Sequence, residues 1–409
     1  MTAPTLPGAM LGVLGGGQLG RMFAVAARRL GYRVAVWSDA PDAPALAHAD
    51  LPTQAPYDDT AALAAFTAAI DVCTVEFENL PADLLRAIER RVPLRPSAEA
   101  IGATQHRGRE KRALTELGAP LAPWRPLEAA GDAHAAATAL EAATAATGRP
   151  AVLKTAGFGY DGKGQVAIPA TGPWPEAALA LLAAEPCVLE AFVDLELELS
   201  VVVARSPEGE VHAFPVAENH HARHVLDLTV MPARVSEAVA ERADALARRV
   251  VTGLGVIGLA CVELFLTRDG DLWVNEVAPR PHNSGHVTIE ACRVDQFEQQ
   301  VRAVCGLPLG DPGIVRPGAM ANLLGDLWEG GEPDWRAALA VGGARLHLYG
   351  KAAARPGRKM GHLSAVADDG DTAAALVLRA RAALTSGAGA APVGPAAASA
   401  VPSTPRPRA

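Results

Sequence analysis

The 409-residue sequence contains no apolar run that approaches the roughly 18–20 residues needed by a membrane-spanning helix. It also lacks an excess of basic residues, since 37 lysines and arginines stand against 45 aspartates and glutamates, a net charge of −8. Binding to nucleic acid through bulk charge is therefore not expected. Residues 1–7 lack the charged and apolar regions of a signal peptide, so we expect no export and a cytoplasmic location.

Cysteine is scarce as well, with five residues at positions 73, 187, 261, 292 and 305 and no C-x-x-C pair. An odd number of isolated cysteines predicts buried thiols in a reducing cytosol. Hydrophobic residues are plentiful at 50% of the chain, so a sizeable core is available. The length is enough for two to four domains.

The N-terminal region reads as a βαβ unit, which implies a parallel sheet. Its predicted elements are a strand at 10–14, a helix at 21–30, and strands at 33–37 and 71–77. Further along we expect helices at 111–117, 133–147 and 237–251, strands at 151–154, 195–201 and 344–349, and a hairpin over 258–277. Residues 386–409, rich in Ala, Gly, Pro and Ser, read as a disordered tail.

A first glycine cluster, with Gly15, Gly17 and Gly20, fits the pattern G-x-G-x-x-G. Asp39 follows at about the distance of the ribose acid in a nicotinamide-binding fold, which raises a dehydrogenase as one alternative. A tight strand–helix crossover that binds nothing is a second alternative. A cradle for another phosphate, such as that of a ribonucleotide, is a third.

A second cluster runs from Lys154 to Gln165, where glycines at 157, 159, 162 and 164 follow a strand that ends in a lysine. Such a loop can close over a polyphosphate with many backbone donors, and Lys154 and Lys163 can neutralise phosphate charge. It does not fit the Walker pattern. The alternative is a flexible surface hairpin, although so rich a set of side chains is unusual in a mere connector.

The hairpin at 258–277 carries a candidate metal site. Asp269–Gly270 is a two-residue turn signal, and with that turn Glu263 lies directly opposite Glu276. Two facing carboxylates destabilise a ladder unless a cation such as Mg²⁺ lies between them. The alternative is a solvent-exposed face with screened acids. Asn275 would alternate to the other face of an ideal strand, which makes it the weaker ligand.

Two polar segments complete the set of candidates. The run at 278–286, with His282, Asn283 and His286, lacks zinc-site spacing and is better interpreted as a substrate loop. The loop that holds Lys351, Arg355, Arg358 and Lys359 suits a phosphate-binding rim, with a solvated basic loop as the alternative.

Taken together, these residues resemble the 5-(carboxyamino)imidazole ribonucleotide synthetases of the ATP-grasp superfamily. The matching motifs are GGGQLGRM (15–22), EFEN (76–79), KTAGFGYDGKGQ (154–165), NEVAPRPHNSGH (275–286) and RPGRKMGH (355–362), with a weaker match at 215–226. They occur in family order and span the chain to about residue 370.

The resemblance implies an α/β and α+β architecture. It consists of a Rossmann-like pre-ATP-grasp domain (1–105), an ATP-grasp domain of two subdomains (106–315, with a mobile loop at about 155–166), and a small, mostly β C-terminal domain (316–385) before the tail. The implied reaction is ATP- and bicarbonate-dependent carboxylation of 5-aminoimidazole ribonucleotide through carboxyphosphate, in purine biosynthesis. Mg²⁺, or Mn²⁺, would be the cofactor, and a homodimer is implied.

The resemblance also implies the site residues. Metal ligands would be Glu263 and Glu276, and catalytic groups Lys154, Asp161 and Arg280. ATP would contact Arg107, Lys111, Lys154, Gly159, Tyr160, Asp161, Gly162, Lys163, Gly164, Gln165, Glu190, Ala191, Phe192, Val193, Glu198, His221, Asn275 and Glu276. The ribonucleotide would contact Gly17, Gln18, Leu19, Glu76, Tyr160, Asp161, Arg280, His282, Asn283, Lys351, Arg355 and Arg358. Arg280 would hold bicarbonate or carboxyphosphate, and Asp161 would orient the amine.

Three rival functions remain open from the sequence. Another purine-pathway ATP-grasp ligase would share the nucleotide machinery but not RPGRKMGH. An NAD-dependent dehydrogenase would leave the loop at 154–165 and the two hairpin glutamates unexplained. A non-catalytic nucleotide-binding regulator would not need to keep the metal acids.

Overall fold

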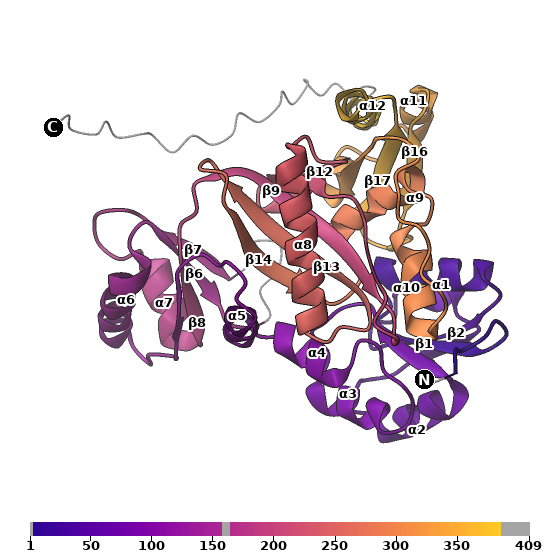
Figure 1. Cartoon of the computed structure of the whole chain (residues 1–409), viewed down its shortest axis with the longest axis horizontal. Coiled ribbons are helices and arrows are strands. Elements are labelled where there is room, and N and C mark those ends of the chain that lie inside the picture. Colours follow the sequence, from indigo (N-terminus) through magenta and orange to yellow (C-terminus); the bar gives the residue numbers. More distant parts are fainter. Residues whose placement is uncertain (1–2, 158–163, 386–409) are drawn as a thin grey trace.

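The computed structural model describes residues 3–157 and 164–385, and in these residues the chain forms three β-sheets with helices packed on them (Figure 1). The five cysteines are buried and free, which confirms the prediction of buried thiols. In the described part of the chain, no helix is long and apolar enough to cross a membrane.

The N-terminal unit is built on a four-stranded parallel sheet of order β3-β2-β1-β4, which confirms the predicted βαβ start. Its strands are β1 (Met10–Leu14), β2 (Arg33–Ser38), β3 (Leu51–Gln54) and β4 (Val72–Val75). Its helices are α1 (Gln18–Arg29), η1 (Leu46–His48), α2 (Thr60–Ala69), α3 (Ala82–Glu89) and α4 (Ala98–Thr104). Helix α1 begins earlier than predicted because a buried carboxylate, described below, accepts hydrogen bonds from its first amides.

Strand β1 is buried along its whole length because helices cover both faces of this sheet. On one face, Leu11 and Val13 pack against Phe23 of α1 and Phe297 of α10 (Gln296–Cys305). On the other face, the cluster around Trp37 includes side chains from α2 and α3. When both faces of a parallel sheet are covered, its strands have apolar sequences along their whole length, as β1 has with MLGVL.

A second, smaller unit follows helix α5 (Arg107–Glu116) and lies apart from the rest of the molecule in Figure 1. It holds an antiparallel sheet of order β5-β8-β6-β7 with α6 and α7 packed together. The elements are β5 (Trp124–Leu127), α6 (Ala133–Thr147), β6 (Ala151–Thr155), β7 (Gln165–Ile168), α7 (Glu176–Ala184) and β8 (Cys187–Ala191). The predicted helix at 133–147 is confirmed in both bounds.

The central sheet has nine strands, in the order β14-β13-β9-β11-β12-β15-β17-β16 with β10 paired to β9. Helix α8 packs on one face of the sheet and α10 on the other. The elements before residue 306 are β9 (Leu195–Arg205), β10 (Val211–Ala213), β11 (Ala217–Ala222), β12 (Val225–Met231), α8 (Glu237–Gly253), β13 (Gly258–Thr267), β14 (Leu272–Ala278), η2 (Asn283–Val287), α9 (Thr288–Ala291) and α10. Because α10 also packs on α1, it joins this sheet to the N-terminal unit.

The C-terminal elements extend the same sheet. They are β15 (Gly318–Leu324), η3 (Gly325–Trp328), α11 (Trp335–Ala340), β16 (Arg345–Leu348), β17 (Lys359–Val366) and α12 (Gly370–Ala383). Strand β15 pairs with β12 over Gly318–Ala321, so backbone hydrogen bonds run without a break from the central strands into the C-terminal ones. Loops on either part are thereby fixed relative to each other.

Candidate active site

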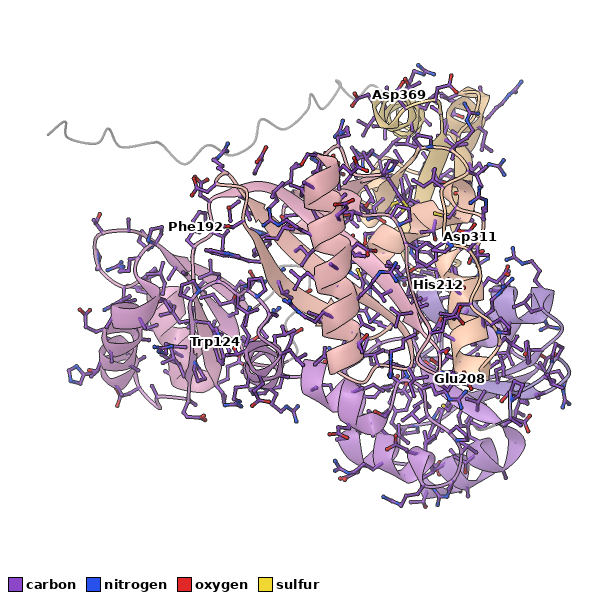
Figure 2. The ribbon with its side chains drawn as sticks, viewed as in Figure 1. Trp124, Phe192, Glu208, His212, Asp311 and Asp369 are labelled. Atoms are coloured by element: carbon purple, nitrogen blue, oxygen red, sulfur yellow. The ribbon has the colours of Figure 1, made fainter. Side chains whose placement is uncertain are left out.

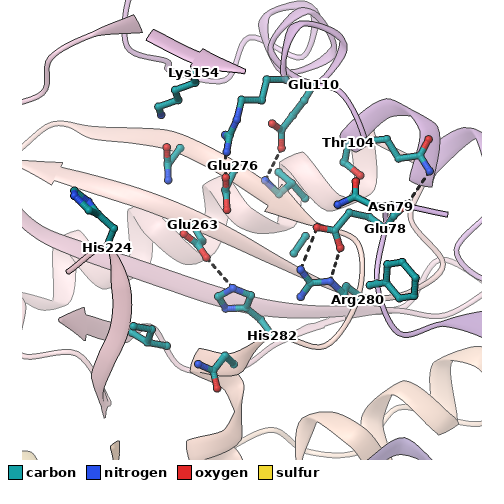
Figure 3. Close-up of a pocket in the computed structure, with 18 of the residues that line it drawn as sticks. Glu78, Asn79, Thr104, Glu110, Lys154, His224, Glu263, Glu276, Arg280 and His282 are labelled. Atoms are coloured by element: carbon teal, nitrogen blue, oxygen red, sulfur yellow. Dashed lines mark hydrogen bonds and ion pairs between the residues drawn. The ribbon is translucent and has the colours of Figure 1, made fainter. Parts of the chain in front are cut away.

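Residues from all three sheets line one cavity of about 530 Å³ (Figure 3). Lys154 enters from β6 of the small sheet, and Glu263 and Glu276 from the hairpin β13–β14 of the central sheet. Glu76 follows β4 of the parallel sheet, and Lys359 begins β17. Groups suited to phosphates, to a metal and to a second substrate therefore share one space.

The hairpin β13–β14 has the predicted register at the two glutamates, but not for the predicted reason. Glu263 pairs with Glu276, whereas near the turn Leu266 pairs with Leu272. The prediction of a two-residue turn is wrong: the amide of Thr267 donates to Asp271 O (2.9 Å), so the connection has three residues. A bulge between Val274 and Glu276 then restores the register.

The extra residue of this bulge is Asn275, which turns into the cavity together with Glu276. A bulge re-aims side chains, so the ideal alternation that would turn Asn275 to the other face does not hold here, and Asn275 joins Glu276 at the cavity. Its Oδ1 is buried and has no hydrogen-bond partner among the described residues. Asn275 therefore brings to the cavity wall a buried acceptor that the described residues do not satisfy.

The two facing carboxylates each have a cationic neighbour. Arg107 Nη1 lies 3.0 Å from Glu276 Oε2, and His282 Nε2 lies 2.8 Å from Glu263 Oε1. Burial raises the pKa of Glu263, but His282 more than offsets this and the pKa falls to about 2. Burial lowers the pKa of His282, and nearby Cys261 and Glu263 raise it to about 10. Each of the two acids thus has a positively charged partner within hydrogen-bond distance.

At the small sheet, Lys111 and Lys154 both contact the carboxylate of Glu190, with Nζ–Oε distances of 3.0 and 3.2 Å. All three side chains are buried. Burial raises the pKa of Glu190, but Lys154 and Lys111 outweigh it and lower the pKa to about 2. Burial also lowers the pKa of Lys154. Lys154 thus presents a desolvated ammonium group to the cavity.

The backbone amides of the first glycine cluster bind a carboxylate of the protein itself. Glu76 accepts hydrogen bonds from the amides of Gly17 and Leu19 at the start of α1, the second at 3.2 Å. A Cβ on Gly17 would lie 2.2 Å from Glu76 Oε1, so a larger residue there would force the Glu76 carboxylate to shift. A dinucleotide pyrophosphate would need the same amides. The dehydrogenase alternative therefore finds no support in the site.

Arg280, just after β14, forms a bidentate ion pair with Glu78 from the loop after β4 (Figure 3). Its Nε donates to Glu78 Oε2, and its Nη2 donates to Oε1 at 3.1 Å. Burial raises the pKa of Glu78, but the guanidinium of Arg280 outweighs it and holds the pKa below the ordinary range. This ion pair joins the central sheet to the parallel one.

The C-terminal basic loop meets the N-terminal unit at the edge of this region. Arg21 donates to Leu348 O, and Arg358 Nη2 lies 3.9 Å from Asp42. Lys351 donates to Lys359 O at 2.7 Å. Burial raises the pKa of Glu76, and the charge of Lys351 opposes part of that rise. Basic groups of this loop therefore lie close to the first glycine cluster.

Three family models match the chain in order. The ribonucleotide synthetase preATP-grasp domain matches residues 9–105, the ATP-grasp domain matches 112–297, and the phosphoribosylaminoimidazole carboxylase C-terminal domain matches 318–376.

Among curated proteins, the chain is 42% identical to an N5-carboxyaminoimidazole ribonucleotide synthase of Bacillus subtilis (strain 168), over 88% of this chain and 91% of the relative. A synthase of the same name from Brucella melitensis is 41% identical over 88% and 97%. The chain belongs to the N5-carboxyaminoimidazole ribonucleotide synthase family. The family assignment predicted from the sequence is confirmed, and the chain is an ATP-grasp ligase.

Solved structures agree with this family and its three-part fold. A crystal structure of the ADP complex of an N5-carboxyaminoimidazole ribonucleotide synthetase is 40% identical, with a TM-score of 0.87, over 93% of this chain and 98% of that one. The enzyme from Aspergillus clavatus in complex with ADP and 5-aminoimidazole ribonucleotide is 31% identical, with a TM-score of 0.81, over 92% and 98%.

Many residues predicted for this synthase family line the cavity. They are Gln18, Leu19, Glu76, Arg107, Lys154, Gln165, Glu198, His221, Glu263, Asn275, Glu276, Arg280, His282 and Asn283. Glu198 and His221 form an ion pair at 3.2 Å. Burial lowers the pKa of His221, but Glu198 and Glu263 outweigh burial and leave the pKa raised.

Other predicted residues lie around the cavity rather than on its lining. Lys111 and Glu190 form the buried network behind Lys154, and Gly164 closes a turn against Thr155. Ala191, Phe192 and Val193 lie on the connection from β8 to β9, where Phe192 is half exposed (Figure 2). Among the described basic residues of the C-terminal loop, Lys359 lines the cavity, and Lys351, Arg355 and Arg358 do not. The predictions for Gly159, Tyr160, Asp161, Gly162 and Lys163, like that for the tail, fall outside the described residues.

Sequence reasoning missed two buried acids of the site. Glu78 lies within the EFEN motif, but only Glu76 received a role. Glu110 shares a helix face with Arg107 and Lys111, a spacing that could have revealed it. Its carboxylate accepts a hydrogen bond from the amide of Val277 at 2.6 Å. Burial, and the nearby charge of Glu276, raise the pKa of Glu110 to about 8.

Proposed function

We propose that this cavity is where the chain carries out its family's reaction, ATP-dependent carboxylation of 5-aminoimidazole ribonucleotide to the N5-carboxyamino product. The observation that supports this is the convergence of Lys154 from the small sheet, the acids of the hairpin, and Glu76 and Arg280 from opposite sides of one space. The nucleotide occupies the side of Lys154, and the ribonucleotide the side of Glu76.

The nucleotide end has the donors and acceptors that ATP needs. Lys154 and Arg107 offset phosphate charge, and Glu190 keeps Lys154 and Lys111 in place. The chain from Glu190 to Val193 holds the adenine as the hinge between the two sheets, and Glu198 and His221 lie at its entrance.

The donor set at the hairpin fits Mg²⁺, or Mn²⁺ in its place. In the described residues no cluster of three or more His, Cys, Asp or Glu side chains can hold a metal by itself. Mg²⁺ commonly takes one or two carboxylates and completes its shell with substrate phosphates and water. Glu263, Glu276 and the unpartnered Oδ1 of Asn275 supply those protein ligands. Bound there, the ion would offset charge on the ATP phosphates.

In the proposed chemistry, an oxygen of bicarbonate attacks the γ-phosphorus of ATP, and ADP leaves with the bonding electrons to give carboxyphosphate. The exocyclic amine of the ribonucleotide then attacks the carboxyl carbon, phosphate leaves, and the amine loses a proton. Arg280 holds bicarbonate and then carboxyphosphate, and His282 lies beside it. The contribution of the protein is mainly positioning and charge stabilisation.

The ribonucleotide is proposed to contact Glu76, Asn283 and the loop at Gly17, with Lys351, Arg355 and Arg358 directed at its phosphate. From the family motif, Asp161 orients the amine and Tyr160 contacts the same substrate. Turnover by Asp161→Asn at the wild-type rate and nucleotide affinity would exclude that role. We further propose a homodimer in the cytoplasm, and light scattering of the purified protein tests its mass.

The deciding experiment measures phosphate release from Mg-ATP and bicarbonate, with and without 5-aminoimidazole ribonucleotide. Strong stimulation by this ribonucleotide is expected, with none from formate, glycine or glycinamide ribonucleotide. If the protein binds ATP tightly and the ribonucleotide does not stimulate phosphate release, the substrate assignment is wrong. Stimulation by one of the other compounds would favour another ligase of the superfamily.

A further inference from the structure

The guanidinium group of Arg280 is held on one edge by a single acid. Glu78 accepts from Nε and from Nη2, and Pro281 O accepts from Nη1 at 3.1 Å. Both charged side chains are largely buried, with exposed fractions of 23% for Glu78 and 18% for Arg280. A buried guanidinium with two acceptors on one edge has little freedom to rotate.

The same contacts define what remains for a substrate. A guanidinium carries five N–H groups. The described residues accept three of them, which leaves one N–H on each terminal nitrogen. Both N–H groups point away from the Nε–Nη2 edge of the guanidinium, which Glu78 occupies. Arg280 also lines the cavity. The free donors are therefore available to a small planar oxyanion in the cavity.

Glu78 is itself fixed by the N-terminal unit. The amide group of Gln105 donates to Glu78 O at 2.7 Å and to Leu80 O at 2.8 Å. The amide of Leu80 donates to Glu78 O at 2.8 Å, which closes a tight turn. The carboxylate is thus mounted on a fixed loop after β4, and Arg280 is placed relative to the parallel sheet as well as to its own strand.

Glu78 is the acid that contacts the guanidinium group of Arg280. Burial lowers the pKa of Arg280, but the charge of Glu78, with a smaller contribution from Glu276, outweighs burial and raises it above the ordinary range. The guanidinium group therefore stays charged in its buried position.

We propose that Glu78 is a positioning residue that fixes one edge of Arg280, so that the two remaining donors bind bicarbonate and then carboxyphosphate. This inference rests on the proposed function, because it takes bicarbonate as the occupant of the Arg280 site. Glu78 does not contact the reacting atoms. Its effect is exerted through Arg280 alone.

The test uses Glu78→Gln in the full-length protein, with each substrate varied in turn. We expect the KM for bicarbonate to rise about 10- to 100-fold, as for loss of a charge-assisted two-pronged pair, while the KM for ATP stays within about 2-fold. The carboxylated product formed per phosphate released should also fall, because poorly held carboxyphosphate is lost to water. Glu99→Gln is the matched control, since Glu99 is an exposed acid in α4 of the same unit.

A double-mutant cycle separates positioning from a general structural effect. In an Arg280→Lys background, where the two-pronged pair is already lost, Glu78→Gln should change the KM for bicarbonate by less than about 2-fold. An equal effect in both backgrounds would overturn the proposal. If Glu78→Gln does not fold, Glu78→Asp keeps the charge at a shorter reach, and an unchanged KM for bicarbonate in that variant would also overturn it.

The outcomes distinguish this inference from the proposed function. Wild-type phosphate release that does not depend on bicarbonate or on the ribonucleotide contradicts the proposed function, whatever Glu78 does. Wild-type release with the expected dependence, combined with an unchanged KM for bicarbonate in Glu78→Gln, contradicts only the positioning role.

Discussion

Lys154 and Glu190 lie on the neighbouring strands β6 and β8, and their charged atoms are 3.2 Å apart in a buried site that Lys111 completes from α5. The network has two ammonium groups and one carboxylate, so it carries a net positive charge before any nucleotide is present. Burying such charges is unfavourable unless each has a partner. An incoming polyphosphate would supply the missing negative charge.

Glu190→Gln should therefore be destabilising as well as inactivating. It removes the carboxylate from two buried ammonium groups, and we expect a loss of roughly 3–5 kcal/mol in the free energy of unfolding, measured in urea. ATP should recover part of the stability, because its phosphates replace the missing charge. Glu185→Gln, an exposed acid just before β8, is the control and should be neutral. Equal stability of the two variants would contradict this account of the network.

The glycine cluster offers a steric prediction. Gly17 has an ordinary φ of −78°, so Gly17→Ala is opposed only by the contact with Glu76. We expect a loss of about 1–3 kcal/mol in unfolding free energy, as for overpacking, and weaker binding of the ribonucleotide. Gly102→Ala in α4 is the control: a Cβ there meets nothing within 4 Å. It should stabilise the protein by about 0.5–1 kcal/mol. Unchanged stability of Gly17→Ala would mean that Glu76 moves aside.

Asn275 gives a prediction about the metal and nucleotide end. Because Asn275 Oδ1 has no partner among the described residues, Asn275→Ala removes the proposed ligand oxygen without breaking a hydrogen bond of that oxygen to the described residues. We expect the Mg²⁺ concentration for half-maximal activity to rise about 10-fold, equivalent to about 1.4 kcal/mol. The urea midpoint should hardly change. Asp269→Ala, in the exposed turn of the same hairpin, serves as the control. A large drop in stability with unchanged Mg²⁺ dependence would assign Asn275 a structural role instead.

The sequence predicted most of the local elements and many of the residues that line the cavity, and the exceptions have physical causes. The pairing of Glu263 with Glu276 was predicted by counting residues back from a two-residue turn. The pairing is correct only because the turn is one residue longer than predicted and the bulge adds one residue to β14. Neither irregularity has a local signal beyond Asp269–Gly270. Contacts between segments far apart in the chain could not be predicted from the sequence. Glu78 and Arg280 are 202 positions apart, and their pairing follows from how the parallel sheet docks on the central one.

The continuity of the C-terminal strands with the central sheet was likewise not predicted. Register between β12 and β15 depends on backbone pairing between segments almost a hundred residues apart. The sequence signals there, a strand and a basic loop, are compatible with a separate domain. Continuity matters for the site because it fixes Lys359, at the start of β17, relative to the hairpin β13–β14.

A column of stacked histidine rings links these C-terminal strands to η2 and α10. His362 of β17 stacks on His347 at 4.4 Å and on His286 at 4.9 Å between ring centroids, and His286 stacks on Phe297. Tyr349 pairs with Nδ1 of His362 at 2.9 Å. Burial lowers the pKa values of His286 and His362 well below 6.5, and the neighbouring histidines lower them further. Lys359 and His282 also disfavour a charge on His286.

These two histidines should make the folded state sensitive to acid. Below about pH 6.5, the ordinary pKa of histidine, His286 and His362 bind protons in the unfolded chain but stay neutral in the folded protein. The free energy of unfolding therefore falls as pH falls. The loss is up to about 1.4 kcal/mol per pH unit for each histidine, or up to about 2.7 for the pair. Glu110, with its pKa of about 8, acts in the opposite direction between pH 8 and its unfolded value near 4.5, so only a difference between variants isolates the column.

His362→Gln removes one of these histidines and keeps an acceptor for Tyr349. In urea unfolding between pH 7 and pH 5, we expect this variant to lose stability less steeply than the wild type, by up to about 1.4 kcal/mol per pH unit. His134→Gln, an exposed histidine in α6, should keep the wild-type slope. If His362→Gln also follows the wild-type slope, the column accepts protons in the folded state, and the acid sensitivity must come from other groups.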